Sequence, residues 1–245
     1  MRFTIILSCI LLFAACKTNT FIADVEGRSI QMDNSLEADA AIEQLIQPYK
    51  VKLDATMNVR IGEVAKSLEK GRPESLLGNW VCDALHVQCE EYFEQQVDFT
   101  YTNNGGLRIP ALNKGDVTIG NIFELMPFDN MMVVVELDYE SLMKMINHFA
   151  AKGGEPISHH FKMIIEDGKP TNITINGKPI DKNRIYKMVT TDYIANGGDK
   201  LFFLKDRPTA HLQKLFRDAV IEYIKVETAK GNILDAKLDG RVTEK

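Results

Sequence analysis

An almost uninterrupted apolar stretch, NMMVVVELD at residues 130–138, places the strongest constraint on how this chain folds. A strand with only one buried face would alternate apolar and polar residues, so this pattern predicts a strand buried on both faces. The next segment, YESLMKMINHFAAKGG at 139–154, has apolar residues at helical spacing and ends in two glycines. Glycines commonly terminate helices, so we predict an amphipathic helix directly after the strand.

The rest of the chain alternates between similar patterns. We predict further strands at 58–68, 97–103, 159–167, 171–177 and 184–191, with Asn176-Gly177 as a hairpin turn. We predict further helices from Leu36, with Ser35 as its cap, at 73–96, at 115–128 with Pro127 as its stop, and at 210–231. No Pro/Ser-rich linker or low-complexity segment divides these elements. The fold class is therefore α+β, with mixed sheets flanked by helices in one compact domain at 35–245.

The N-terminal segment, MRFTIILSCILLFAAC, differs in character from the rest. One basic residue precedes an apolar run that is too short for a stable membrane span but suits a secretory signal. The run ends in FAAC, which resembles a bacterial lipobox, and polar residues follow at once. We interpret 1–16 as a lipoprotein signal peptide with Cys16 as the lipidated residue, and 17–34 as a polar linker. The alternative is an ordinary signal peptide with an incidental cysteine. The first interpretation predicts a lipid-anchored protein of the cell envelope, periplasmic or surface-exposed.

The charge balance bears on the partners of the chain. Lys and Arg number 29 against 34 Asp and Glu, a net charge of -5, and no basic block occurs. A nucleic acid polymer is therefore not an expected partner, whereas a small anionic ligand remains open. Cys82 and Cys89 lie seven residues apart in a predicted helix, which separates their Cα atoms by roughly 10 Å. That distance is too long for a disulfide, so both cysteines are predicted to be core residues.

Three glycine-rich or aromatic segments stand at the ends of predicted elements: NNGGLR at 103–108, MPFDN at 126–130 and DYIANGGD at 192–199. Paired glycines mark turns in which the backbone takes a positive φ or approaches another group closely. Together with ESLLGNWVCDAL at 74–85, these segments resemble the C-terminal domain of the 5′-nucleotidases, in the order and spacing of that family. The resemblance covers roughly residues 50–245. It implies a domain that holds the base and ribose of a nucleotide.

The resemblance assigns roles to three side chains. Phe128 matches one of two aromatic residues that sandwich the base, and Tyr193 matches the other, where a phenylalanine is usual. Stacking on an aromatic face contributes about 1–3 kcal/mol per base and tolerates any base. Asp199 matches the aspartate that binds the ribose hydroxyls, a role that suits a carboxylate because it only accepts hydrogen bonds.

The resemblance also implies roles for polar residues and glycines. Asn103 and Arg108 match residues near the base, ribose and phosphate, and a guanidinium fork is suited to phosphate. Arg72 lies one residue from the position of a further family arginine. Gly197 and Gly198 are expected to leave clearance for the ligand.

The metal ligands of a two-metal phosphoesterase have no counterpart in this sequence. Neither Asp-x-His nor Gly-Asn-His occurs in it. His159 and His160 are neighbours in a predicted strand, where side chains point to opposite faces and cannot bind one ion together. We therefore expect no catalytic or metal-ligating residue and no cofactor in this chain, and divalent metals only in a partner subunit. Whether the protein is an enzyme is left open, and it is expected to be inactive alone.

Two functions remain open at this point. In the first, the chain is the nucleotide- or nucleoside-binding domain of a split 5′-nucleotidase, acting with a separately encoded metallophosphoesterase in extracytoplasmic nucleotide breakdown. In the second, it is a non-catalytic envelope lipoprotein that binds nucleosides or nucleotides. A third reading, a degenerate structural relic, would follow if no nucleoside binds.

Overall fold

The structure is a computed structural model. It describes residues 26–30, 33 and 36–245. The predicted signal peptide with Cys16, most of the predicted linker and the predicted Ser35 cap lie outside the described residues. The chain divides into two units, Met1–Ile46 and Gln47–Lys245.

Helix α2 (Ala40–Met57) begins in the first unit and ends in the second. Its first turn is capped by Asp39, whose Oδ1 accepts hydrogen bonds from the backbone N–H of Ala41 at 2.9 Å and of Ile42 at 3.2 Å. A short acidic side chain at this position is a preferred helix cap, because it satisfies N–H groups that have no partner within the helix. None of the side chains of α2 is buried.

The second unit contains two four-stranded sheets. The central sheet has the strand order β11-β6-β10-β3, in which only the β10–β3 pair is parallel. The other sheet has the order β12-β7-β8-β9, in which only the β12–β7 pair is parallel. The strands of the central sheet are β3 (Phe99–Thr100), β6 (Met131–Leu137), β10 (Tyr186–Thr191) and β11 (Thr209–Leu215). Those of the other sheet are β7 (Phe161–Glu166), β8 (Lys169–Ile175), β9 (Lys178–Pro179) and β12 (Val242–Glu244).

Strand β6 is buried on both faces, as its apolar run predicts. Met132 and Val134 belong to one hydrophobic cluster, and Val133, Val135 and Leu137 belong to another. Because successive side chains point to opposite faces of a sheet, the two clusters cover the two sides of the central sheet. The central sheet is therefore the common wall of both cores.

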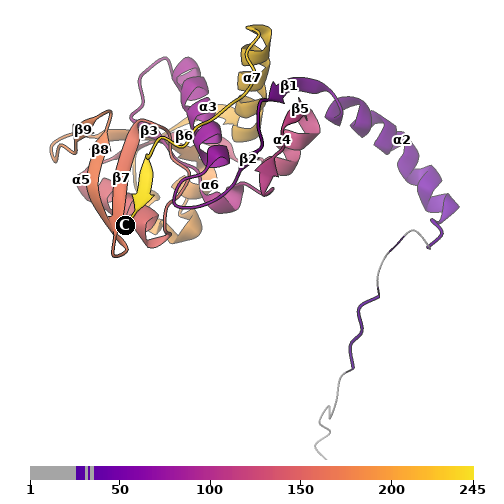
Figure 1. The fold of residues 1–245 in the computed structure, drawn as a ribbon, viewed down its shortest axis with the longest axis horizontal. Helices are drawn as coiled ribbons and strands as arrows, with labels where there is room; N and C mark the ends of the chain where they lie inside the picture. Colours follow the sequence, from indigo (N-terminus) through magenta and orange to yellow (C-terminus); the bar gives the residue numbers. More distant parts are fainter. Residues whose placement is uncertain (1–25, 31–32, 34–35) are drawn as a thin grey trace, which may run out of the picture. The chain divides into compact units, whose positions relative to one another are not determined.

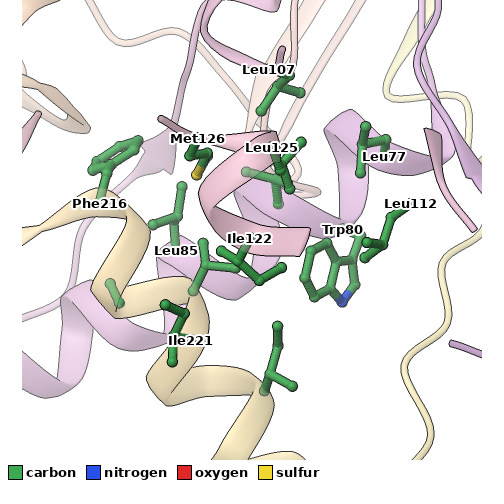
Figure 2. Packing of buried hydrophobic residues seen from close by; sticks show 14 of the residues in the cluster. Leu77, Trp80, Leu85, Leu107, Leu112, Ile122, Leu125, Met126, Phe216 and Ile221 are labelled. Atoms are coloured by element: carbon green, nitrogen blue, oxygen red, sulfur yellow. The ribbon is translucent and has the colours of Figure 1, made fainter. Parts of the chain in front are cut away.

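The first cluster packs helices against the central sheet. Side chains from α3 (Leu76–Phe93), α4 (Ile119–Leu125) and α7 (Phe216–Ala229) point into one space, as Figure 2 shows for Trp80, Ile122 and Ile221. Helix α3 lies within the predicted range 73–96, and its cap is Ser75, whose Oγ accepts from the N–H of Gly78. Helix α4 begins with a capping box between Thr118 and Asn121 and ends just before Pro127. Two short sheets complete this side: β1 (Arg60–Val64) with β5 (Gly115–Thr118), and β2 (Leu68–Glu69) with β4 (Ala111–Leu112).

The second cluster joins α5 (Tyr139–Ala151) to the other four-stranded sheet, and Figure 1 shows α5, β7 and β8 grouped together. Its centre is aromatic. The ring centroid of Phe149 lies 4.8 Å from that of Tyr101 and 5.9 Å from that of Phe161. Tilted and edge-to-face rings at these distances are the favoured geometries for aromatic pairs. The predicted hairpin is present, with Asn176 and Gly177 at positive φ between β8 and β9.

The structure corrects three predicted helices. The helix expected from Leu36 begins at Ala40, and the first residues of the helix expected at 115–128 form strand β5. Residues 210–231 were expected to form a single helix, but Thr209–Leu215 is strand β11, and helix α7 begins only at Phe216. Strand β11 pairs with β6 through an irregular register between His211 and Leu215, and Gln213 has a φ of 53°. A bulge of this kind breaks the two-residue alternation of a strand, and so removes the signal that would have distinguished it from a helix.

The strand directions bring three loops to one edge of the central sheet. Strands β6 and β10 are antiparallel, with Met132 opposite Thr191, so the segment before β6 lies beside the segment after β10. Strand β3 runs parallel to β10, so the chain also leaves β3 at this edge. The segments MPFDN, DYIANGGD and NNGGLR, which follow or precede these strands, therefore meet.

Candidate functional site

The three loops enclose a pocket of about 330 Å³. Five of the eight residues expected to bind substrate line it, and they come from all three loops. The lining residues are Asn103, Gly105, Gly106, Arg108, Phe128, Asn130, Tyr193 and Asp199. Phe128 is 48% exposed and Tyr193 is 46% exposed, so both rings offer aromatic surface that the protein itself does not cover.

Asp199 is held by hydrogen bonds from two other pocket residues. Its Oδ2 accepts from the amide nitrogen of Asn103 at 3.0 Å, and its Oδ1 accepts from the hydroxyl of Tyr193 at 3.1 Å. The backbone N–H of Asp199 donates to the same hydroxyl at 3.2 Å. Each carboxylate oxygen can accept two hydrogen bonds, so both retain capacity for a ligand.

The glycines next to Asp199 make room for side chains of the protein. A Cβ on Gly198 would lie 2.4–2.6 Å from three ring atoms of Tyr193. A Cβ on Gly197 would lie 2.9 Å from Cε of Lys205, and the φ of Gly197 is +88°. Clearance for a ligand stays a prediction for these glycines, and the protein atoms close to them are a further reason for their small size. Gly198 lets the ring of Tyr193 lie against the turn that presents Asp199.

A buried carboxylate holds the backbone of the loop NNGGLR at 103–108. Glu155, 5% exposed, accepts from the backbone N–H of Asn104 at 2.6 Å. Its other oxygen accepts from Nη2 of Arg72 at 2.7 Å. A Cβ on Gly106 would lie 2.8 Å from Oδ1 of Asn103, so this glycine leaves space for the side chain that bonds Asp199.

Arg72 lies outside the pocket described above. It lines a second, open hollow of about 590 Å³ with Lys70, Asn104 and Arg108, and Arg108 lines both hollows. Burial, and then the positive charges of Arg108 and Arg72, lower the pKa of Lys70, whose Nζ donates to the carbonyl oxygen of Leu107 at 2.8 Å. Three cationic side chains around one open hollow favour an anionic ligand group.

Sequence reasoning assigned no role to several residues of this region. Lys70 and Asn130 line the two hollows, and Glu155 and Arg217 lie beneath the loops. Asn130 is the last residue of MPFDN and Lys70 lies two residues before Arg72, and these positions are the one signal that could have found them. Glu155 and Arg217 carry no such signal, because each reaches its loop from a distant part of the chain.

The histidines also lie differently from the prediction. His159 and His160 were expected on opposite faces of a strand, but β7 begins only at Phe161. The ring centroid of His160 lies 3.8 Å from that of His159 and 3.8 Å from that of His86, with an angle of 19° between the rings of His86 and His160. Cys82 and Cys89 are free and buried, as predicted.

The described residues do not fit a two-metal phosphoesterase centre. No group of three or more His, Cys, Asp or Glu side chains among them is placed to hold a metal ion. In the histidine cluster, the ring planes of His86 and His160 are nearly parallel. A nitrogen lone pair lies in the plane of its own ring, so these two side chains cannot converge on one ion.

The chain forms an α+β domain whose pocket carries two exposed aromatic rings, a hydrogen-bonded carboxylate and adjacent cations. Residues 53–206 match the family "5′-nucleotidase, C-terminal domain", and the chain belongs to this family. In the part of the chain that the structure describes, no helix is long and apolar enough to cross a membrane.

Individual relatives resemble the chain over part of their length. It is 24% identical to a 5′-nucleotidase of Rattus norvegicus over 247 residues, which covers 88% of this chain and 42% of that protein. It is 26% identical to Protein UshA of Escherichia coli over 198 residues, with 79% and 35% covered. The chain therefore spans less than half the length of these relatives.

Solved structures of low sequence identity share the fold. A 5′-nucleotidase precursor from Thermus thermophilus superimposes with a TM-score of 0.71 at 21% identity, covering 82% of this chain and 42% of that one. The NAD nucleotidase of Haemophilus influenzae gives a TM-score of 0.59 at 20% identity, with 84% and 41% covered.

Proposed function

We propose that this chain is the nucleotide- or nucleoside-binding domain of a 5′-nucleotidase-type phosphohydrolase. A separately encoded metallophosphoesterase subunit would supply the divalent metals and the cleavage step. The observation that carries the proposal is the placement of Phe128, Tyr193, Asp199 and Arg108 around one pocket. These are the groups that recognition of a base, a ribose and an anionic group requires.

Each part of a nucleotide has a matching group. The base would stack on the rings of Phe128 and Tyr193, where each face contributes about 1–3 kcal/mol. The ribose hydroxyls would donate to Asp199, whose oxygens retain acceptor capacity. The phosphate would face Arg108, at the boundary with the hollow that Lys70 and Arg72 line. Arg72 is half-exposed and paired to Glu155, so it can contribute its charge without leaving its partner.

The place of action belongs to the same proposal. A lipid on Cys16 would hold the domain at a membrane of the cell envelope, and the polar residues after it would act as a tether. Nucleotide breakdown would then take place outside the cytoplasm.

Calorimetry with AMP and adenosine tests the binding step. The full chain should bind AMP, and Phe128→Ala and Tyr193→Ala should each weaken binding by about 1–3 kcal/mol. Phe202→Ala provides a matched control, because Phe202 is 62% exposed and does not line the pocket. A wild-type protein that binds no nucleoside or nucleotide would contradict the proposal and favour a structural role.

Reconstitution tests the partnership. A metallophosphoesterase encoded beside this chain should hydrolyse AMP faster, or with a different substrate preference, when this chain is added. Tyr193→Ala should remove the gain while leaving the basal activity of the partner unchanged. If the pair behaves like the metallophosphoesterase alone, the chain is a binding protein without a catalytic role. Turnover by this chain alone with Mn²⁺ or Zn²⁺ would contradict the division of labour.

A further inference from the structure

The position of Phe128 depends on a short loop, Met126–Asn130, between α4 and β6. The ring itself is half-exposed, and Cζ of Arg108 lies 5.8 Å from its centroid. Its backbone must therefore be fixed by other groups if the aromatic surface is to be in place when a base arrives.

One buried arginine bonds to this loop from beneath. Arg217, in the first turn of α7, is 6% exposed. Its Nη1 lies 3.4 Å from the carbonyl oxygen of Met126 and 3.5 Å from that of Phe128, and its Nη2 donates to Oδ1 of Asp129 at 2.7 Å. A guanidinium presents several donors in one rigid plane, so one side chain can bond to three residues of one loop.

Arg217 is itself held in place. Its Cζ lies 3.9 Å from the ring centroid of Phe123 in α4, a close cation–π contact. The residue before it, Phe216, donates its N–H to the carbonyl oxygen of Asn130 at 2.9 Å. Helix α4, the loop and the start of α7 are thereby tied together around one guanidinium.

A carboxylate connects the far end of the loop to the other aromatic residue. Oδ1 of Asp192 accepts from the N–H of Met131 at 3.0 Å and from the N–H of Tyr193 at 2.8 Å. The same side chain thus bonds to Met131, which follows the loop of Phe128, and to Tyr193, which is the second aromatic residue of the pocket. Neither Asp192 nor Arg217 lines the pocket.

We propose that Arg217 and Asp192 are positioning residues that set the two aromatic rings at a fixed separation before a ligand binds. Arg217 acts by fixing the loop that contains Phe128. Asp192 acts by bonding to the backbone next to that loop and to the backbone of Tyr193. A slot that is formed in advance avoids the ordering cost of binding, so weakening this support should reduce affinity for the base although no ligand contact is removed. The inference rests on the proposed nucleotide site.

Arg217→Lys is the direct test, because lysine keeps the positive charge but loses the planar fork. Calorimetry should show AMP affinity reduced about fivefold or more, the loss expected when one stacking face is misplaced. Affinity for ribose 5-phosphate, which has no base, should change by less than about twofold. In a Phe128→Ala background, Arg217→Lys should have no further effect on AMP binding, because the ring through which it acts is gone.

Two further variants make the result decisive. Arg207→Lys is the matched control, since Arg207 pairs with Asp138 away from the loop, and it should leave both affinities unchanged. If Arg217→Lys does not fold, Asp129→Ala removes the partner whose side chain is 78% exposed, and it should weaken AMP binding while leaving ribose 5-phosphate binding unchanged.

Three outcomes would overturn the inference. Unchanged AMP affinity in Arg217→Lys, or in Asp129→Ala if only that variant folds, would show that the loop needs no such support. An equal loss for AMP and ribose 5-phosphate would show a general structural role. A wild-type protein that binds neither AMP nor adenosine would overturn the proposed function as well, so the two failures are distinguishable.

Discussion

At the scale of single residues, Gly198 gives the clearest steric test of the site. A methyl group there would lie 2.4 Å from the nearest ring atom of Tyr193, and the ring would have to move. Gly198→Ala should therefore displace Tyr193 from Asp199 and weaken AMP binding about fivefold or more, by loss of stacking. Gly71→Ala is the matched control, because its added Cβ would meet no atom closer than 3.7 Å. Calorimetry on both variants checks this, and equal affinities would contradict the placement of the ring.

Lys70 provides a second test at this scale, directed at the phosphate rather than the base. It lines the cationic hollow beside Arg108 and was not recognised from the sequence. Lys70→Met should weaken AMP binding about two- to fivefold, as expected for a partly exposed ion pair, and should leave adenosine binding unchanged. Lys114→Met, in a different hollow, should affect neither. An equal loss for AMP and adenosine would place the phosphate elsewhere.

At the scale of elements, a stack of histidines predicts sensitivity to acid. His86 of α3 packs against His160, just before β7. Burial, and then the neighbouring histidines, lower the pKa of His86 to about 3. Burial, and then His159, lower the pKa of His160 to about 4, although Asp83 opposes both shifts. Arg241 faces His160 as a further positive charge, and Glu90 lies 3.8 Å from His86.

The sign of the pH effect follows from these directions. The unfolded chain protonates both histidines near pH 6.5, whereas the folded chain keeps them neutral down to about pH 4. The unfolded state therefore binds more protons between these values, and the free energy of unfolding falls as the pH falls, by about 1 kcal/mol per pH unit for each histidine. Above pH 6.5 this contribution is fully present.

Urea titrations at several pH values measure this slope. His160→Phe keeps a ring against His86 but cannot be protonated. The slope of its free energy of unfolding against pH, between about pH 4 and 6.5, should therefore be smaller by the contribution of about one proton. His211→Phe is the matched control, since His211 is exposed on β11 and stacks on no other histidine. Identical slopes in wild type and His160→Phe would show that the stack does not govern acid stability.

Elements with a regular local pattern were predictable, and irregular ones were not. The burial of β6 on both faces follows directly from its apolar run, and α3 lies within the predicted range 73–96. Strand β11 was missed because its bulge at Gln213 breaks the alternation, and its apolar residues then fit a helix. The three-residue strand β12 is too short to leave a pattern at all.

The residues of the candidate site also fall into those that the sequence could indicate and those that it could not. Phe128, Tyr193 and Asp199 could be assigned from the sequence because each stands in a short segment that resembles a motif of the family. The contacts that support them could not be predicted, because Arg217 lies 89 residues from Phe128, and Asp192, although it lies in DYIANGGD, is 61 residues from Met131. Such contacts depend on the sheet order, which brings distant segments to one edge and which no local window of the sequence contains.

At the scale of the whole second unit, the C-terminal segment joins the two hydrophobic clusters. Leu234 belongs to the cluster with Trp80, and Val242 belongs to the cluster with Phe149. Between them, Arg241 is 2% exposed and bonds to Asp83, to Asp239 and to the carbonyl oxygen of Ile157. Burial lowers the pKa of Arg241, but the hydrogen bonds and charges of Asp239 and Asp83 together raise it, so it stays charged in the interior. The two cores share a sheet and a terminal segment, and should unfold together.

Arg241→Met tests this coupling. Removal of one partner from a buried ion pair leaves charges without compensation, and we expect a loss of about 3 kcal/mol, the lower end of the usual range because Asp83 is one-third exposed. Trp80 is the single tryptophan and lies in the first cluster, so its fluorescence reports that core, while far-UV circular dichroism reports the whole fold. In urea both signals should shift together to lower midpoints, whereas Arg60→Met, which breaks an exposed pair, should shift neither by much. If Arg241→Met shifts the dichroism but not the fluorescence, the second cluster unfolds independently and the terminal segment does not couple the cores.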